Sequence, residues 1–155
     1  MDIPPKIKNF LWKVCQNGLP TASRLAQRGT SIPSTCQLCN CAVEDDVHFL
    51  LECPYVRPLF RLPTHVNSTV SSMINHSREI KPIFSFIGNK LTSVAKAELA
   101  FSWWTAWYIR NQFVFKQVPI PHRESSLRII KTHKENWSKT AHFEYSLDED
   151  FPSRT

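Results

Sequence analysis

Three cysteines and one histidine between residues 36 and 53 constrain the fold of this chain more than any other feature of its sequence. Cys36 and Cys39 form a C-x2-C pair, His48 follows after eight residues, and Cys53 after four more. Two thiolates at this spacing can hold one tetrahedral ion from a tight turn, and two further ligands from a helix complete the shell. Because four protein ligands leave no position for water, the pattern predicts a structural zinc site and not a hydrolytic one.

Three further residues bear on this site. Cys41 could replace one of the four ligands, but C-x-C is a less usual turn for two thiolates, so we rank it lower. Glu44 lies four residues before His48 on a helix expected at residues 44–52, and we expect its carboxylate to accept the proton of the non-ligating imidazole nitrogen. Cys15 lies on the apolar face of the first expected helix and is predicted to be a buried core thiol. If no metal binds, the cysteines are core or redox residues.

The first five residues have neither a basic start nor an apolar stretch, so we expect no signal peptide. Cysteines in a chain without a secretory signal favour thiols or metal ligands over disulfides. The most apolar run, residues 99–115, is interrupted by polar side chains and is too short to span a bilayer. We therefore expect an intracellular protein, nuclear or cytoplasmic, that is not secreted and does not enter a membrane.

The pattern of apolar residues predicts a mainly α fold. The chain has only 3 glycines but 5 tryptophans, which favours helices over a turn-rich β-protein. We expect a small zinc-stapled helical lobe followed by a pair of long C-terminal helices, near residues 91–116 and 123–143. The predicted division is a zinc-binding lobe at 1–60, a linker or long surface loop at 61–82, a helical C-terminal region at 83–145 and a frayed acidic tail at 146–155.

The longest expected helix carries two neighbouring aromatic stripes. Trp103 and Trp107 follow one stripe, and Trp104 and Tyr108 follow the other. Such side chains could stack on unpaired bases, but stripes at helical spacing more often form a core or contact a partner helix, and we favour that interpretation. Arg110 and the asparagine that follows it, at the end of this run, are expected to be structural and not catalytic, capping the helix or pairing locally.

The first 60 residues or so resemble a known family. Residues 6–13 (KIKNFLWK), residues 18–21 (GLPT) and the Arg-Gly pair at 28–29 lead into the four metal ligands. This order is similar to the zinc-binding domain that follows the reverse transcriptase in plant non-LTR (LINE-type) retrotransposons. Residues 104–115 also look like a helix often found downstream in those polyproteins. The resemblance implies a nucleic-acid role and one zinc ion held by Cys36, Cys39, His48 and Cys53.

The same comparison sets a limit. The chain has no Tyr/Phe-x-Asp-Asp polymerase motif, and the Asp-Asp pair at 45–46 lies inside the zinc region. The ribonuclease H domain expected downstream is also missing. We therefore expect a detached or domesticated fragment of such a polyprotein.

Charge is unevenly distributed along the chain. The whole sequence carries a formal charge of +6, whereas residues 36–53 contain four acidic residues and no Lys or Arg. Phosphate contact depends on Lys and Arg, so a nucleic-acid surface must lie outside the zinc segment. We expect it on the flanking helices, with contacts from Lys6, Lys8, Lys13, Arg24, Arg28, Arg128, Lys131 and Lys134. The alternative is that these side chains are solvated helix faces.

The sequence shows no nucleophile elbow, phosphate-binding glycine loop or metal-binding carboxylate pair, so we expect no enzyme and no small-molecule substrate. The leading hypothesis is a non-enzymatic zinc module of retroelement origin that contacts RNA or DNA. The second is a protein-interaction adaptor that uses the acidic zinc lobe or the Trp-rich helix. The third is a decayed fragment without a selected function.

Overall fold

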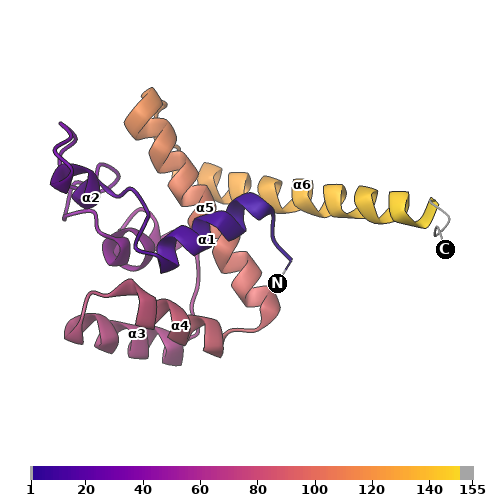
Figure 1. Ribbon diagram of the computed structural model, residues 1–155, viewed down its shortest axis with the longest axis horizontal. Coiled ribbons are helices and arrows are strands. Elements are labelled where there is room, and N and C mark those ends of the chain that lie inside the picture. Colours follow the sequence, from indigo (N-terminus) through magenta and orange to yellow (C-terminus); the bar gives the residue numbers. More distant parts are fainter. Residues whose placement is uncertain (1, 151–155) are drawn as a thin grey trace.

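The computed structural model describes the backbone of residues 2–150 and the side chains of residues 2–140 (Figure 1). Its helices follow in the order α1 (Pro5–Cys15), α2 (Ala22–Gln27), η1 (His48–Glu52), η2 (Arg57–Leu59), α3 (Thr64–His76), α4 (Ile80–Lys90), α5 (Ser93–Lys116) and α6 (Arg123–Asp150). Within residues 2–150 an isolated bridge between Thr35 and Val43 is the only β pairing. The predicted mainly α fold is confirmed. No helix in this range is both long and apolar enough to cross a membrane.

Helix α5 is central and packs against both α1 and α6 (Figure 1). It begins after the N-cap Thr92, whose hydroxyl oxygen accepts a hydrogen bond from the backbone N–H of Ala95 at 3.2 Å. Buried residues occupy several faces of α5 because other elements surround it. Trp103 and Trp107 are 2% and 8% exposed, which confirms the first predicted stripe as core.

The second aromatic stripe lies nearer the surface of α5. The rings of Trp104 and Tyr108 stack with centroids 5.7 Å apart, and Tyr108 remains exposed. His133 of α6 meets both rings edge to face. Lys6 of α1 lies 4.5 Å from the Trp104 ring centroid. This stripe therefore joins α1, α5 and α6 at one junction.

Helix α1 carries the first part of the core. Pro5 suits its first turn because a proline has no N–H to leave unpaired there. Ile7, Phe10 and Val14 recur at helical spacing and are buried against α4 and α5. Cys15, predicted to be a buried thiol, is only partly buried at the end of this helix, and desolvation raises its pKa.

The prediction of an irregular segment at residues 61–82 is wrong. Helix α3 occupies most of it, and α4 begins before it ends, so that the two helices pack side by side (Figure 1). Only Val66 and Val70 of α3 are buried. The hydroxyls of Ser68, Thr69 and Ser71 on the exposed face donate to carbonyls four residues earlier. The apolar stripe of this polar helix is so short that its periodicity in the sequence does not predict a helix.

Helix α6 begins close to the predicted residue and runs further than expected. Its start is held by Tyr55, whose hydroxyl lies 2.7 Å from the carbonyl oxygen of Pro121 and 2.7 Å from Ser126 Oγ. Figure 1 shows the C-terminal part of α6 extending beyond the other helices. The helix includes residues 146–150, where a frayed tail was predicted. Residues 151–155 of that tail lie outside the described residues.

Candidate metal centre

Two local structures supply the four predicted ligands. Cys36 and Cys39 lie in a loop closed by hydrogen bonds from Cys36 N to Ala42 O and from Asn40 N to Cys36 O, each 2.8 Å. Asn40 adopts a left-handed conformation (φ 55°) that turns the chain back after Cys39. His48 begins the π-helical turn η1, and Cys53 N donates to His48 O at 2.7 Å, which places Cys53 one wide turn later.

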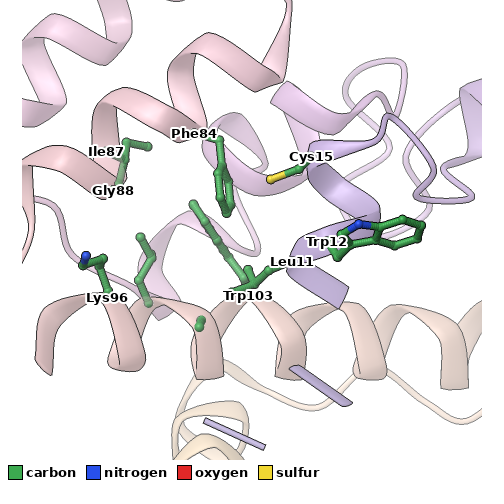
Figure 2. A pocket seen from close by; sticks show the side chains of 10 residues that line it. Leu11, Trp12, Cys15, Phe84, Ile87, Gly88, Lys96 and Trp103 are labelled. Carbon is green, nitrogen blue, oxygen red and sulfur yellow. The ribbon is translucent and has the colours of Figure 1, made fainter. Parts of the chain in front are cut away.

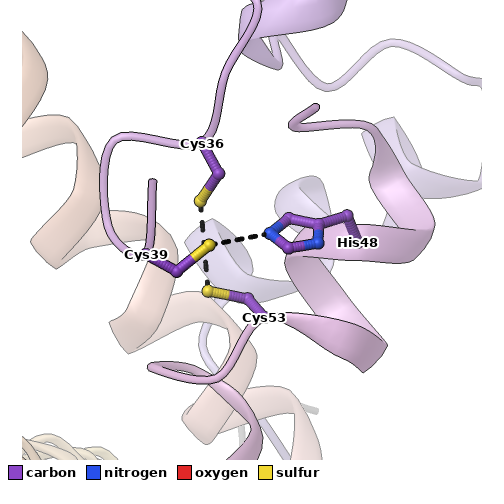
Figure 3. Close-up of side chains that lie close together, drawn as sticks. All are labelled: Cys36, Cys39, His48 and Cys53. Atoms are coloured by element: carbon purple, nitrogen blue, oxygen red, sulfur yellow. Dashed lines mark hydrogen bonds between the residues drawn. The ribbon is translucent and has the colours of Figure 1, made fainter. Parts of the chain in front are cut away.

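The ligand atoms of these residues converge on one point (Figure 3). All four lie within 4.8 Å of one another. Cys36 Sγ is 3.9 Å from Cys53 Sγ, and Cys39 Sγ is 3.3 Å from His48 Nε2. A tetrahedral shell with zinc–sulfur bonds of about 2.3 Å and zinc–nitrogen bonds of about 2.0 Å puts its ligand atoms about 3.5–3.8 Å apart. The donor set and its spacing therefore fit a zinc ion closely.

Residues 1–59 match the protein family described as zinc-binding in reverse transcriptase. The cofactor that fits is zinc. The matched segment contains all four ligand residues and covers this accessory zinc-binding region, not a catalytic one. No curated protein and no solved structure matches the chain significantly. The N-terminal part of the chain is accordingly a zinc-binding module.

The other two cysteines lie outside the zinc cluster. Cys41 is exposed, and its Sγ lies 3.1 Å from the carbonyl oxygen of Cys39. Its backbone N–H points at Cys39 Sγ from 3.4 Å and can stabilise a thiolate there. The structure thus assigns Cys41 a supporting backbone contact, while the four predicted ligands form the cluster without it.

Burial and mutual contact set the protonation of the ligands. The hydrogen bond with Cys53, together with desolvation, raises the pKa of Cys36 to about 12. The same hydrogen bond lowers the pKa of Cys53. A hydrogen bond with Cys36 raises the pKa of His48. Because zinc takes thiolates and neutral imidazole, zinc binding must release protons from this cluster.

Each acidic residue of the zinc segment pairs with an arginine from another part of the chain. These arginines belong to α2, to the connection between α3 and α4, and to α5. The most exposed of these ion pairs join Arg78 to Asp45 and to Glu52, at 2.9 and 2.8 Å. The full set of pairs is Glu44–Arg110, Asp45–Arg78, Asp46–Arg24 and Glu52–Arg78. Every acidic side chain of the segment is thus paired within the fold, with Arg78 shared by two of them.

Glu44 has a different partner from the predicted imidazole. It precedes the helical turn η1, and its carboxylate accepts hydrogen bonds from Arg110 Nη2 at 2.6 Å, Arg110 Nε at 3.2 Å and Ala22 N at 2.7 Å. Both Glu44 and Arg110 side chains are 1% exposed. The backbone N–H of His48, not its imidazole, donates to Asp45 Oδ1 at 2.7 Å. Glu44 therefore fixes the zinc segment to α2 and α5.

The sequence interpretation did not predict the main contact of Arg110. Its predicted local bond exists, since Nη1 donates to Asn111 Oδ1 at 3.0 Å. Its main partner, however, is Glu44, 66 residues away. One signal was available: Arg110 continues the spacing of Trp103 and Trp107, and a cation on a buried stripe needs a buried anion.

The predicted phosphate contacts fall into two groups. Arg24 pairs with Asp46, whereas Lys6 is exposed and lies over the Trp104 ring. The other predicted contacts lie on the exposed or partly exposed faces of α1, α2 and α6, namely Lys8, Lys13, Arg28, Arg128, Lys131 and Lys134.

One cleft gathers part of this charge. It has a volume of about 350 Å³ and lies between η2, α5 and α6. Arg61, Arg123, Lys131 and Lys134 line it, and Glu98 is the single acidic residue of its lining. Arg61 and Arg123 were not among the predicted contacts. Each stands alone in sequence beside a proline-containing connection, where no pattern marks it.

Proposed function

We propose that the chain is a non-enzymatic structural-zinc module of retroelement origin that contacts nucleic acid through a basic surface. The observation that carries the proposal is the cationic cleft between η2, α5 and α6. Four cations and one carboxylate line it, and phosphate backbones bind where Lys and Arg gather. The reduced thiols that zinc requires suit an intracellular location.

The two lysines of this cleft form only weak ion pairs. Lys131 Nζ is 3.9 Å from Glu135, and Lys134 Nζ is 3.8 Å from Glu98. These exposed pairs are at the long end of the range for an ion pair, and surface pairs of this kind contribute little. The arginines around the zinc centre, in contrast, are held by short bonds to the acids of that segment.

The zinc centre supports the cleft without lining it. The ligand Cys53 is followed by Tyr55, which bonds to the start of α6, and then by η2, which forms one wall of the cleft. Pro58, Leu59 and Phe60 of this wall lie five to seven residues after the ligand Cys53. Zinc thus fixes the position of η2 relative to α6, which is a structural and not a catalytic role.

The adaptor hypothesis based on the acidic zinc lobe gains no support from this arrangement. The acids of residues 36–53 are already paired with arginines of the same chain. A basic partner would have to compete with these contacts.

The test is the salt dependence of binding to a labelled 20-nucleotide single-stranded RNA, with DNA of the same sequence in parallel. Four phosphate contacts give a slope of about −3 in log K against log salt. The double variant Arg123→Glu and Lys131→Glu should abolish binding, whereas Lys90→Glu together with Lys116→Glu, outside the cleft lining, should weaken it far less. Absence of binding at about 50 mM salt, or equal effects of the two double variants, would overturn the proposal.

The contribution of zinc is measured in the same assay. The unmodified protein and Cys41→Ser should each contain one zinc per chain, while Cys39→Ser should lose the metal and, through η2, most of its RNA affinity. A metal-free protein that remains folded and binds RNA equally well would contradict the structural role given to zinc.

A further inference from the structure

A second cavity lies between α1, α4 and α5 (Figure 2). Its volume is about 210 Å³, and almost all of its lining is apolar. Leu11 and Cys15 come from α1, Phe84 from α4, and Leu99 and Trp103 from α5. Figure 2 shows Trp12 at the edge of this groove, and its side chain is 61% exposed. An exposed tryptophan beside an apolar groove marks a docking surface more than a core.

The space beside Gly88 in the groove is not imposed by neighbouring atoms. It lies in the interior of α4 and lines the groove. A Cβ added at this position would meet nothing within 4 Å. Glycine inside a helix is about 1 kcal/mol less favourable than alanine. Gly88 therefore lowers helix stability although no neighbouring atom excludes a larger side chain. Its lack of a side chain keeps the groove open.

Two of the three helices that form the groove, α1 and α4, carry only positive charge. Helices α1 and α4 together carry five lysines and no acidic residue. Lys96 lines the groove itself, and Lys81 lies near enough to Cys15 to oppose the rise of the pKa of this thiol. Lys6 lies over the Trp104 ring, so the lysines of α1 and α4 that remain are Lys8, Lys13, Lys81 and Lys90. An occupant of this groove must combine an apolar face with negative charge.

We propose that the groove binds an amphipathic helix of a partner protein, with apolar side chains of that helix inserted beside Gly88 and its acidic side chains against the lysines. Grooves between helices take helices by such anchors at i and i+4. Nucleic acid fits less well, because base edges need hydrogen-bond partners and Lys96 is the only side chain of the lining that offers a strong one. The groove shares only Leu99 with the lining of the cationic cleft, so this proposal does not depend on the proposed function.

The probe is a pool of fluorescein-labelled 15-residue helical peptides, with leucine, phenylalanine or tryptophan at i and i+4 on one face and glutamate on the others. Fluorescence anisotropy in about 0.15 M salt should detect binding to the zinc-loaded full chain at micromolar concentration. Gly88→Leu fills the groove and should weaken binding by at least about tenfold. This variant should unfold at the same temperature as the unmodified protein or higher, since leucine favours helix.

A charge variant keeps the test decisive if Gly88→Leu fails to fold. Lys96→Glu should weaken the acidic peptides and strengthen peptides in which lysine replaces glutamate, while Lys116→Glu, outside the groove, should do neither. The proposal is overturned if no acidic peptide binds below about 1 mM, or if both groove variants bind unchanged. It is also overturned if Gly88→Leu instead abolishes binding of a 20-nucleotide RNA or of laurate, since the groove then takes another class of ligand.

Discussion

Glu44 and Arg110 form the most buried ion pair among the described residues. Their side chains are 1% exposed, and the guanidinium also lies 4.5 Å from the Trp107 ring centroid. Desolvating two charges is costly, and the pair is tolerated because the carboxylate accepts three hydrogen bonds and the guanidinium keeps several acceptors. Such a pair contributes to specificity of docking between the zinc segment and α5 more than to stability in itself.

Removing one partner of this pair should be strongly destabilising. Glu44→Gln leaves a buried cation without its anion, and we expect the free energy of unfolding to fall by about 3–5 kcal/mol. Arg78→Met, which removes an exposed arginine that pairs with acids of the zinc segment, should cost no more than about 1 kcal/mol. Urea denaturation of the zinc-loaded proteins measures both. Similar losses in the two variants would mean that burial of the Glu44 pair does not set its strength.

At the scale of elements, local patterns decided which helices could be recognised. Helices α1 and α5 carry dense apolar residues, α1 begins with a proline and α5 follows the N-cap Thr92, and both lie close to where the sequence predicts them. Helix α3 was missed because tertiary contact with α4, not local periodicity, stabilises its two buried valines. The position of α6 depends on Tyr55, 66 residues before the carbonyl that its hydroxyl contacts.

Tyr55→Phe tests how α6 is held. The variant leaves the Pro121 carbonyl and Ser126 Oγ without this partner, and we expect a loss of about 1–3 kcal/mol in stability. Amide hydrogen exchange should quicken at the start of α6 before it does elsewhere. Tyr108→Phe removes a hydroxyl from an exposed ring and is the matched control, expected to stay within about 0.5 kcal/mol. Uniform exchange changes along the chain would contradict a local role for Tyr55.

At the scale of the whole molecule, the zinc segment and the long helices share one core. Phe49 packs edge to face on Trp107 with centroids 5.1 Å apart, and Trp103 Nε1 donates to Leu50 O at 2.9 Å. The residues of α1, η1, α4 and α5 belong to the same buried cluster. The zinc lobe at 1–60 therefore buries its apolar face against a part of the chain that the sequence interpretation assigned to another unit.

A fragment of residues 1–60 should bind zinc without folding fully. The four ligands are local and remain available, but Glu44 loses Arg110, and Phe49 loses Trp107. We expect one zinc per fragment and much faster amide exchange at residues 49–51 than in the full chain. Exchange protection equal to that of the full chain would instead show that the predicted lobe is an independent domain, as the sequence division proposed.

The sequence by itself determined the zinc ligands and the helical class. Ligand spacing is a local property, because a tight turn and one helical turn bring Cys36, Cys39, His48 and Cys53 together whatever the rest of the chain does. Apolar periodicity is local as well, and it sufficed for α1 and α5.

Only the tertiary structure decided which residues meet across long stretches of chain. The arginine partners of the zinc segment come from 22 to 66 residues away, and the basic cleft and the apolar groove each combine side chains of separate helices. No spacing rule encodes such contacts, because they depend on how amphipathic faces pack, and one face can pack in several ways until the whole core is assembled.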